Sequence, residues 1–186
     1  MTTFNTYKMI NKQKFFLVGY MGSGKTTVGK QLAKKLNLQF IDMDLFIETR
    51  FHKNISAIFE EKGEVNFREI ERKALHEIID FENVVISTGG GLPCFFDNMD
   101  VMNKTGTTIY LKVSIEELAN RLKNGKQKRP LIKDKKPEEI KNFIAGHLKE
   151  REVFYNKATF IFETDELFSS ETFRTKIEML IKDIQP

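Results

Sequence analysis

The chain has 186 residues, which is close to the roughly 150 residues typical of a single domain. Its composition, 40% hydrophobic and 30% charged with a net charge of +4, excludes a disordered chain, and no apolar run approaches the ~18 residues that span a bilayer. A single cysteine, Cys94, and the absence of a secretory apolar segment favour a cytoplasmic location. The first 41 residues contain seven lysines and no acidic residue, which indicates an anionic ligand near this part of the chain.

Apolar runs and helical periodicity alternate along the chain. Strands are predicted at Lys14–Val18, Leu38–Ile41, Val84–Ser87, Thr107–Val113 and Ala158–Phe162. Helices are predicted from about Gly24 to Leu36 and at Leu45–Phe51, Ser56–Lys62, Val65–Phe81, Ile115–Lys123, Pro137–Tyr155 and Ser170–Ile184. This alternation predicts one α/β domain over residues 1–186, in which a five-stranded parallel sheet is covered by helices on both faces as three layers. The core is expected over about 14–165, after an N-terminal extension over 1–13.

Residues 19–26 read GYMGSGKT and match the phosphate-binding motif G-x-x-x-x-G-K-[ST]. A predicted strand precedes the motif and a predicted helix follows it, which is the context this P-loop requires. Its backbone N–H groups and the start of the helix can surround an anion. Lys25 is placed to reach the β- and γ-phosphates, and the Thr26 hydroxyl to coordinate Mg²⁺. The motif therefore predicts binding of a nucleoside triphosphate and leaves the phosphate acceptor open.

Two large classes of P-loop protein, the GTPases and the motor or large ATPases, are disfavoured. Residues 103–106 and 156–159 begin like the guanine-binding motif N-K-x-D but lack its aspartate. The predicted third strand ends in Ser87 and Thr88 rather than in the acidic residue of a Walker B site. An acidic pair instead follows the second strand, as Asp42 and Asp44. This position favours a small-molecule kinase whose acceptor binds at the carboxyl ends of the strands.

Asp42 and Asp44 are two residues apart at the end of a predicted strand, so both are expected to face the same crevice. One carboxylate there can hold Mg²⁺, and the other can accept a hydrogen bond from an acceptor hydroxyl. The alternative is that Asp44 only caps the helix predicted to begin at Leu45.

With these motifs, the chain resembles the shikimate kinases over about residues 14–164. The resemblance rests on GYMGSGKT, the D-x-D of Asp42–Asp44, FREIE at Phe67–Glu71, ISTGGG at Ile86–Gly91, RPL at Arg129–Leu131 and REVFYNKA at Arg151–Ala158, in this order. It implies a P-loop kinase that transfers the ATP γ-phosphate to the 3-hydroxyl of shikimate, a step toward chorismate and the aromatic amino acids. It also implies a monomer with a mobile lid over about 124–136.

The resemblance implies roles for individual residues. Nucleotide contacts fall to Gly22, Ser23, Gly24, Lys25, Thr26, Thr27, Arg121 and Arg129, and a Mg²⁺ site to Thr26 and Asp42. Substrate contacts fall to Asp44, Arg68, Gly89, Gly90, Gly91 and Arg151. Lys25, Asp44 and Arg129 are implied to be catalytic, and proton acceptance by Asp44 is a hypothesis. Glu71 lies on the same helix face as Arg68 and is expected to stabilise the site. The alternative is that Arg68 and Glu71 form an exposed ion pair on the helix surface with no role in function.

The same residues bear on three other functions. A gluconate kinase shares the P-loop but lacks the triple glycine, and an adenylate kinase has a proline in the P-loop where this chain has Met21-Gly22. A non-catalytic nucleotide-binding or nucleic-acid-binding module is suggested by the pI of about 9.0 and the lysines near residues 123–136. No aromatic residue lies among those lysines to stack on bases, so nucleic acid is not an expected partner. A membrane is not an expected partner either, because the apolar runs are too short to span a bilayer. The three histidines show no metal-ligand spacing and are assigned no role.

Overall fold

The computed structural model describes residues 13–124, 137–163, 165 and 170–184. Five parallel strands form its central sheet: β1 (Lys14–Val18), β2 (Gln39–Asp42), β3 (Val84–Ser87), β4 (Thr107–Lys112) and β5 (Phe160–Glu163). Their order in space is β2-β3-β1-β4-β5. Within the described residues, this confirms the predicted α/β fold with a five-stranded parallel sheet. Residues 1–12 of the expected N-terminal extension (1–13) and residues 125–136 of the expected lid (124–136) lie outside the described residues.

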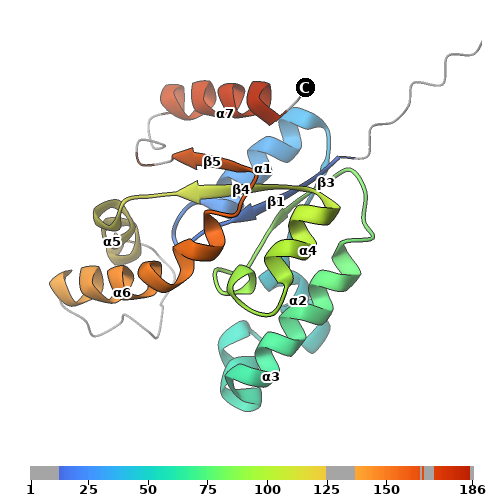
Figure 1. Ribbon diagram of the computed structural model, residues 1–186, viewed down its shortest axis with the longest axis vertical. Coiled ribbons are helices and arrows are strands. Elements are labelled where there is room, and N and C mark those ends of the chain that lie inside the picture. Colours follow the sequence, from blue (N-terminus) through green and yellow to red (C-terminus); the bar gives the residue numbers. More distant parts are fainter. Residues whose placement is uncertain (1–12, 125–136, 164, 166–169, 185–186) are drawn as a thin grey trace, which may run out of the picture.

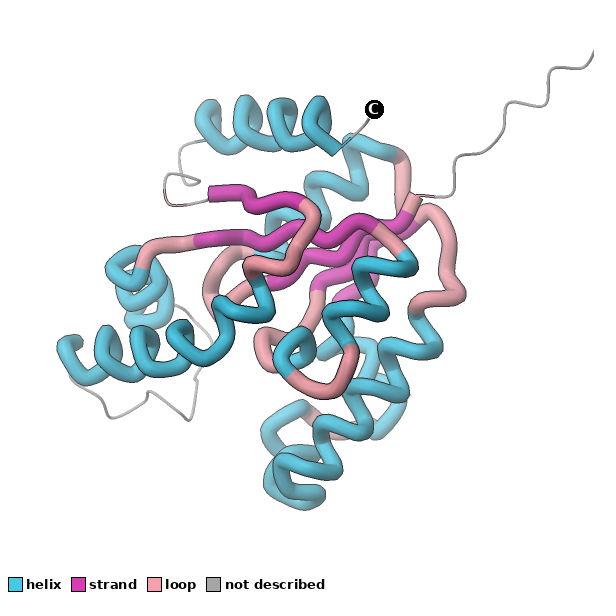
Figure 2. Tube along the Cα trace, in the orientation of Figure 1, coloured by secondary structure: helices cyan, strands magenta, loops and turns pink. Residues whose placement is uncertain are grey.

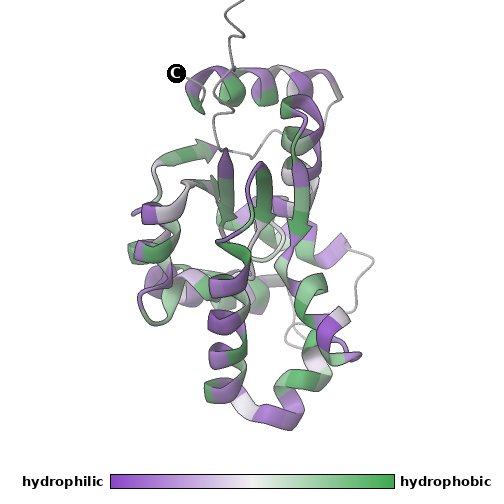
Figure 3. Ribbon diagram, turned by 90° about the vertical axis from the view of Figure 1, so that its right-hand side faces the viewer, coloured by the Kyte–Doolittle hydropathy of each residue, from purple (hydrophilic) through white to green (hydrophobic). Residues whose placement is uncertain are grey.

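The central strand β1 is buried on both faces, which explains why its sequence is a continuous apolar run. Phe16 and Val18 belong to one core, and Phe15 and Leu17 belong to the other. Because side chains alternate across a strand, a single run of apolar residues serves both layers. In Figure 3 the strands are coloured mainly green, which marks hydrophobic residues.

The helices cover both faces of the sheet (Figures 1 and 2). One core packs β1, β3 and β4 against α1 (Lys25–Leu36) and α7 (Ser170–Ile184). The other core packs the opposite face against α2 (Met43–Phe51), α3 (Ile55–Ile78), α4 (Asn98–Thr105), α5 (Ile115–Asn124) and α6 (Pro137–Tyr155). The three layers are therefore those expected from the alternation of strands and helices.

Most predicted elements agree with the structure to within a few residues, and three differences bear on the site. The two helices predicted on either side of Gly63 are joined as α3, with Gly63 at φ 73° forming a kink between them. Helix α4 and the short 3-10 helix η1 (Leu92–Cys94) are not among the predicted elements, because α4 is only eight residues long and mostly polar, with only Met99, Val101 and Met102 as apolar residues. Helix α2 begins at Met43, two residues earlier than predicted.

No helix in the ranges that the structure describes combines the length and apolar character needed to cross a bilayer.

We predict that Phe16→Ala lowers the free energy of unfolding by about 3–5 kcal/mol, because it empties a fully buried site on the central strand. Urea denaturation measures this change. Met179→Ala, on the 58% exposed Met179 of α7, is the control and is expected to change stability by no more than about 0.5 kcal/mol. A loss below about 1 kcal/mol for Phe16→Ala would contradict the assignment of β1 to the centre of the core.

Candidate active site

The P-loop joins β1 to α1 through glycines in conformations that other residues rarely adopt. Gly19 has φ 142°, and a Cβ on it would lie only 2.8 Å from the carbonyl oxygen of Leu111. Glycine is therefore required here both by conformation and by space. The Lys25 Nζ donates hydrogen bonds to the carbonyl oxygens of Gly19 (2.7 Å) and Tyr20 (3.0 Å), so its ammonium group lies over the loop.

Asp42 connects the P-loop to the start of α2. One of its carboxylate oxygens accepts a hydrogen bond from the Thr26 hydroxyl at 2.9 Å. The other accepts from the backbone N–H groups of Asp44 (3.1 Å) and Leu45 (3.4 Å), which makes Asp42 the N-cap of α2. The alternative in which Asp44 caps this helix is therefore wrong.

Asp44 lies in the first turn of α2 rather than on a strand, so strand alternation is not what brings it to the site. A Cβ on Gly89 would lie 3.1 Å from its Oδ1, which places the carboxylate against the Gly89–Gly91 turn. Solvent reaches Asp44, yet the surrounding protein desolvates its carboxyl and raises its pKa, with the nearby Asp42 charge adding to the shift. Lys25 acts in the opposite direction on the same carboxyl.

The three glycines after β3, which we call the glycine turn (Gly89–Gly91), lie directly beside the P-loop. A Cβ on Gly90 would be 3.5 Å from both the Gly19 carbonyl oxygen and the Met21 nitrogen. The turn is held to β1 by Thr88, whose N–H (3.1 Å) and hydroxyl (2.9 Å) both donate to the Leu17 carbonyl. The two glycine-rich segments are thus adjacent because β1 and β3 pair in parallel.

Arg68 and Glu71, one turn apart on α3, form a largely buried ion pair. The Arg68 Nη1 donates to Glu71 at 2.6 Å, and the two side chains are only 11% and 4% exposed. Burial raises the pKa of Glu71, and the Arg68 guanidinium opposes this shift. The exposed surface ion pair that was the alternative is therefore excluded.

Arg68 is fixed further by aromatic rings and by the glycine turn. Its guanidinium carbon lies 4.4 Å from the ring centre of Phe95, with Phe67 and Phe59 at 5.4 and 5.9 Å. A Cβ on Gly91 would lie 2.7 Å from the Arg68 Nη1, so a larger residue there would displace the guanidinium from this position. The Arg68 Nε is buried and has no hydrogen-bond partner in the part of the chain that the structure describes. An unsatisfied donor of this kind is suited to an anionic ligand.

Arg151 approaches the same turn from α6. Its Nη1 would be 3.7 Å from a Cβ on Gly90, and its guanidinium carbon lies 5.5 Å from the ring centre of Tyr20 in the P-loop. The structure thus gathers Asp44, Arg68 and Arg151 around one glycine turn, from three separate helices.

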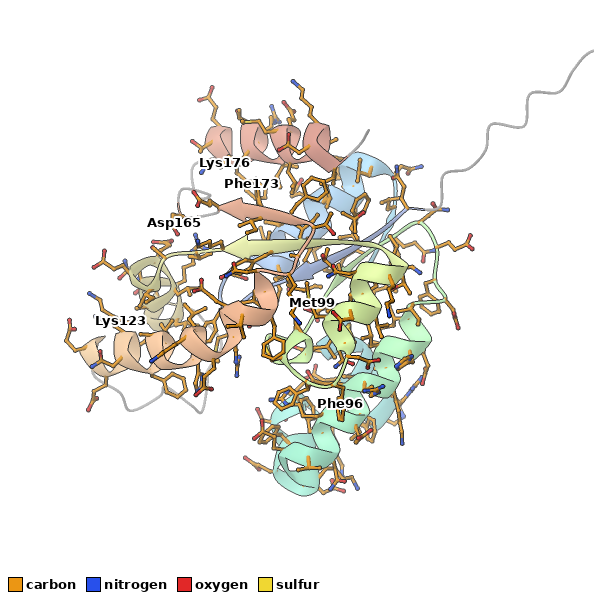
Figure 4. The ribbon with its side chains drawn as sticks, viewed as in Figure 1. Phe96, Met99, Lys123, Asp165, Phe173 and Lys176 are labelled. Atoms are coloured by element: carbon orange, nitrogen blue, oxygen red, sulfur yellow. The ribbon has the colours of Figure 1, made fainter. Side chains whose placement is uncertain are left out.

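The other residues expected at the nucleotide site fall in two groups, those within the described residues and Arg129. Gly22, Ser23, Gly24 and Thr27 lie in the P-loop and the start of α1, and Arg121 extends from α5 to within 3.4 Å of the Gly22 and Ser23 carbonyls. Arg121 also donates to Glu117 at 2.7 Å and to the Asp165 carbonyl at 3.4 Å; Figure 4 labels Asp165 near α5. Arg129, with the proposed lid, lies outside the described residues.

Two residues that support the site, Tyr155 and Phe95, are not among those predicted from the sequence. The Tyr155 hydroxyl donates to the Gly90 carbonyl at 2.5 Å and holds the glycine turn in place. Its spacing of four residues from Arg151 on α6 was the available signal, since residues at i and i+4 share a helix face. No pattern in the sequence indicated Phe95, because its contact with Arg68 joins segments that are distant along the chain.

A separate hollow of about 550 Å³ opens among Lys112–Ile115, Ala145, Leu148, Lys149, Glu152, Glu163 and Asp165. None of these residues is an expected site residue. The site is therefore defined by the side chains that converge on the two glycine-rich segments and not by this hollow.

Known proteins that resemble this chain belong to the family indicated by its sequence motifs. The family model described as shikimate kinase matches residues 21–181. A shikimate kinase of Parabacteroides distasonis is 57% identical over 157 residues, which cover 84% of this chain and 91% of that protein.

Two solved structures agree. The crystal structure of shikimate kinase from Bacteroides thetaiotaomicron superposes with a TM-score of 0.91 at 48% identity, covering 94% of this chain and 99% of that one. Shikimate kinase from Acinetobacter baumannii, solved in complex with shikimate, gives a TM-score of 0.80 at 31% identity, covering 95% and 97%. Because the matched region includes the glycine turn and the helices that bear Asp44, Arg68 and Arg151, the chain belongs to the shikimate kinase family.

Proposed function

We propose that the protein transfers the γ-phosphate of ATP to the 3-hydroxyl of shikimate, which yields shikimate 3-phosphate and ADP. The observation that carries this proposal is the contact between the glycine turn and the P-loop at Gly90. It brings a cluster suited to a hydroxylated carboxylate next to a loop suited to phosphates. Donor and acceptor bound in these places would meet without a large movement of the sheet.

The acceptor is recognised by charge and by shape. Arg68 and Arg151 offer planar guanidinium groups that can bind a carboxylate through two hydrogen bonds each, which lysine cannot reproduce. The pairing of Arg68 with Glu71 and its packing on Phe95 restrict its orientation before the ligand arrives. Asp44 and the backbone of the glycine turn are suited to hydroxyl groups. Gluconate has a carboxylate and hydroxyls as well, so the discrimination between acceptors depends on the rigid arrangement of this cluster.

The Thr26 hydroxyl and the Asp42 carboxylate fit a Mg²⁺ ion. Their oxygens lie 2.9 Å apart beside the P-loop, and hard oxygen ligands of this kind suit that ion. The described residues contain no group of three or more His, Cys, Asp or Glu side chains that could bind a metal. Two protein ligands are in keeping with Mg²⁺, which usually retains several waters and binds phosphates. When bound, the ion neutralises charge on the phosphates.

The chain's own residues supply positioning and further charge neutralisation. Lys25 lies at the P-loop, where its ammonium can exchange its contacts with the Gly19 and Tyr20 carbonyls for phosphate oxygens. Arg121 borders the same loop, and Arg129 is proposed to complete the phosphate site from the lid. Asp44 is proposed to orient the acceptor hydroxyl and to accept its proton as the new O–P bond forms. We also propose that the enzyme is monomeric and cytoplasmic.

The substrate is tested by ATP consumption with Mg²⁺ and three acceptors, shikimate, quinate and gluconate. We expect turnover with shikimate and at least tenfold lower kcat/KM with the other two, because a site built to pair polar groups rejects ligands that leave them unpaired. A coupled assay for ADP measures this. Higher kcat/KM with gluconate than with shikimate would overturn the assignment of the acceptor.

Arg68→Lys is expected to raise the KM for shikimate by about tenfold or more and to leave the KM for ATP within about twofold, because it keeps the charge but removes the planar, two-point contact of a guanidinium with the carboxylate. Steady-state kinetics measure both constants. Arg72→Lys is the matched control: Arg72 lies one turn further along α3, is 30% exposed and pairs with Asp97 on the surface. An equal effect of both substitutions would contradict the role of Arg68.

Asp44 should also determine the acidic limb of the pH profile. Its carboxylate is active only when ionised, so kcat/KM falls as the pH drops through its pKa. Since that pKa is raised, the fall occurs at higher pH than for an ordinary aspartate of pKa about 3.9.

The matching substitution is Asp44→Asn, which should reduce kcat by about a hundredfold or more and remove this limb. The pH dependence of both proteins is measured by the same assay. Near-normal turnover of the variant would eliminate proton acceptance by Asp44.

A further inference from the structure

One ridge of α6 carries four side chains at intervals of four residues: Phe143, His147, Arg151 and Tyr155. Residues at this spacing lie on one helix face, one above another. Three of them contact the two glycine-rich segments. His147 and Arg151 lie against Tyr20 of the P-loop, and Tyr155 binds the Gly90 carbonyl. This ridge therefore connects the nucleotide side and the acceptor side of the site.

Tyr20 occupies a position that the P-loop motif leaves unrestricted, yet its side chain is only 1% exposed. Its hydroxyl and the His147 Nδ1 are 3.1 Å apart, within hydrogen-bond distance. Its ring also lies beneath the Arg151 guanidinium, at 5.5 Å. One aromatic side chain of the P-loop thus contacts two consecutive residues of the ridge.

The His147 ring also packs against Phe143, with ring centres 4.2 Å apart. Burial lowers its pKa, and the neighbouring Arg151 charge adds to the shift, which favours a neutral imidazole. A neutral ring can accept a hydrogen bond at Nδ1 from the tyrosine hydroxyl. It also adds no positive charge next to the arginine that faces the acceptor.

We propose that Tyr20 and His147 are a positioning pair, which holds α6 against the P-loop and so sets the place of Arg151 relative to the bound phosphates. The inference rests on the proposed function, because it assigns Arg151 to the acceptor carboxylate. Neither residue of the pair contacts the reacting atoms. Their hydrogen bond fixes the distance between the loop that holds the donor and the helix that holds the acceptor.

The test compares Tyr20→Phe, His147→Leu, the double variant and His147→Asn with the unaltered protein, through kcat and the KM values for shikimate and ATP. Tyr20→Phe keeps the ring under Arg151 and removes only the hydroxyl. We expect Tyr20→Phe and His147→Leu each to raise the KM for shikimate about three- to tenfold, with the KM for ATP within about twofold. The double variant should be no worse than either single variant, because both remove the same bond. His147→Asn, whose amide can replace the Nδ1, should restore most of the loss.

The matched control is Tyr110→Phe. Tyr110 is as buried as Tyr20, and its hydroxyl also binds α6, by donating a hydrogen bond to Glu152 at 3.1 Å. Glu152 does not belong to the ridge. We expect this substitution to lower the midpoint of thermal unfolding and to leave the KM for shikimate within about twofold. An equal rise in KM would show that any loosening of α6 has the effect, and would overturn the specific role of the pair.

The outcomes separate this inference from the proposed function. Turnover of the unaltered protein with shikimate, combined with unchanged KM values in Tyr20→Phe and His147→Leu, would refute the positioning pair alone. Additive effects in the double variant would refute it as well. Absence of turnover with shikimate in the unaltered protein would refute the proposed function, and this inference with it. Tyr20→Phe is decisive if His147→Leu fails to fold, since the loss of one oxygen leaves the packing intact.

Discussion

The parallel pairing of β1 with β3 is the constraint on which the rest of the site depends. Leu17 lies in register with Ser87, so both strands end at the same edge of the sheet and their following turns meet there. Both turns are rich in glycine, and this allows the Gly90 backbone to approach Gly19 and Met21 with no side chain between them. A phosphate-binding loop and an acceptor-binding turn therefore share one edge.

The helices then supply the charges, and the glycine turn determines how closely they approach. Gly89 leaves space for the carboxylates of Asp44 and Glu71, and Gly91 leaves space for Arg68. Side chains at these positions would push the charged groups apart. The glycines of this turn are thus required less for unusual backbone angles than for the volume they leave free, in contrast to Gly19 in the P-loop.

Burial of the Arg68–Glu71 pair gives the site rigidity at an energetic cost. Two charges removed from water stabilise a protein little, whereas loss of one partner leaves the other uncompensated and costs about 3–5 kcal/mol. Such a pair is therefore held firmly, and its geometry is enforced by the Phe95 ring as well. A guanidinium that is already oriented loses less conformational freedom when it binds a carboxylate.

The sequence alone determined the strands and most of the helices, because alternating buried runs and helical periodicity are local properties. It also determined the P-loop, since GYMGSGKT encodes its backbone path in consecutive residues, and the ordered motifs indicated the family. Only the tertiary structure decided that Asp42, rather than Asp44, caps α2, because this depends on where β2 ends. It likewise decided that Arg68 and Glu71 are buried and that Phe95 packs on Arg68. The contacts of Tyr20 with His147 and of Tyr155 with Gly90 join residues 127 and 65 positions apart, and no local pattern specifies such pairs. Long-range packing creates these contacts, so they become visible only when the whole domain is folded.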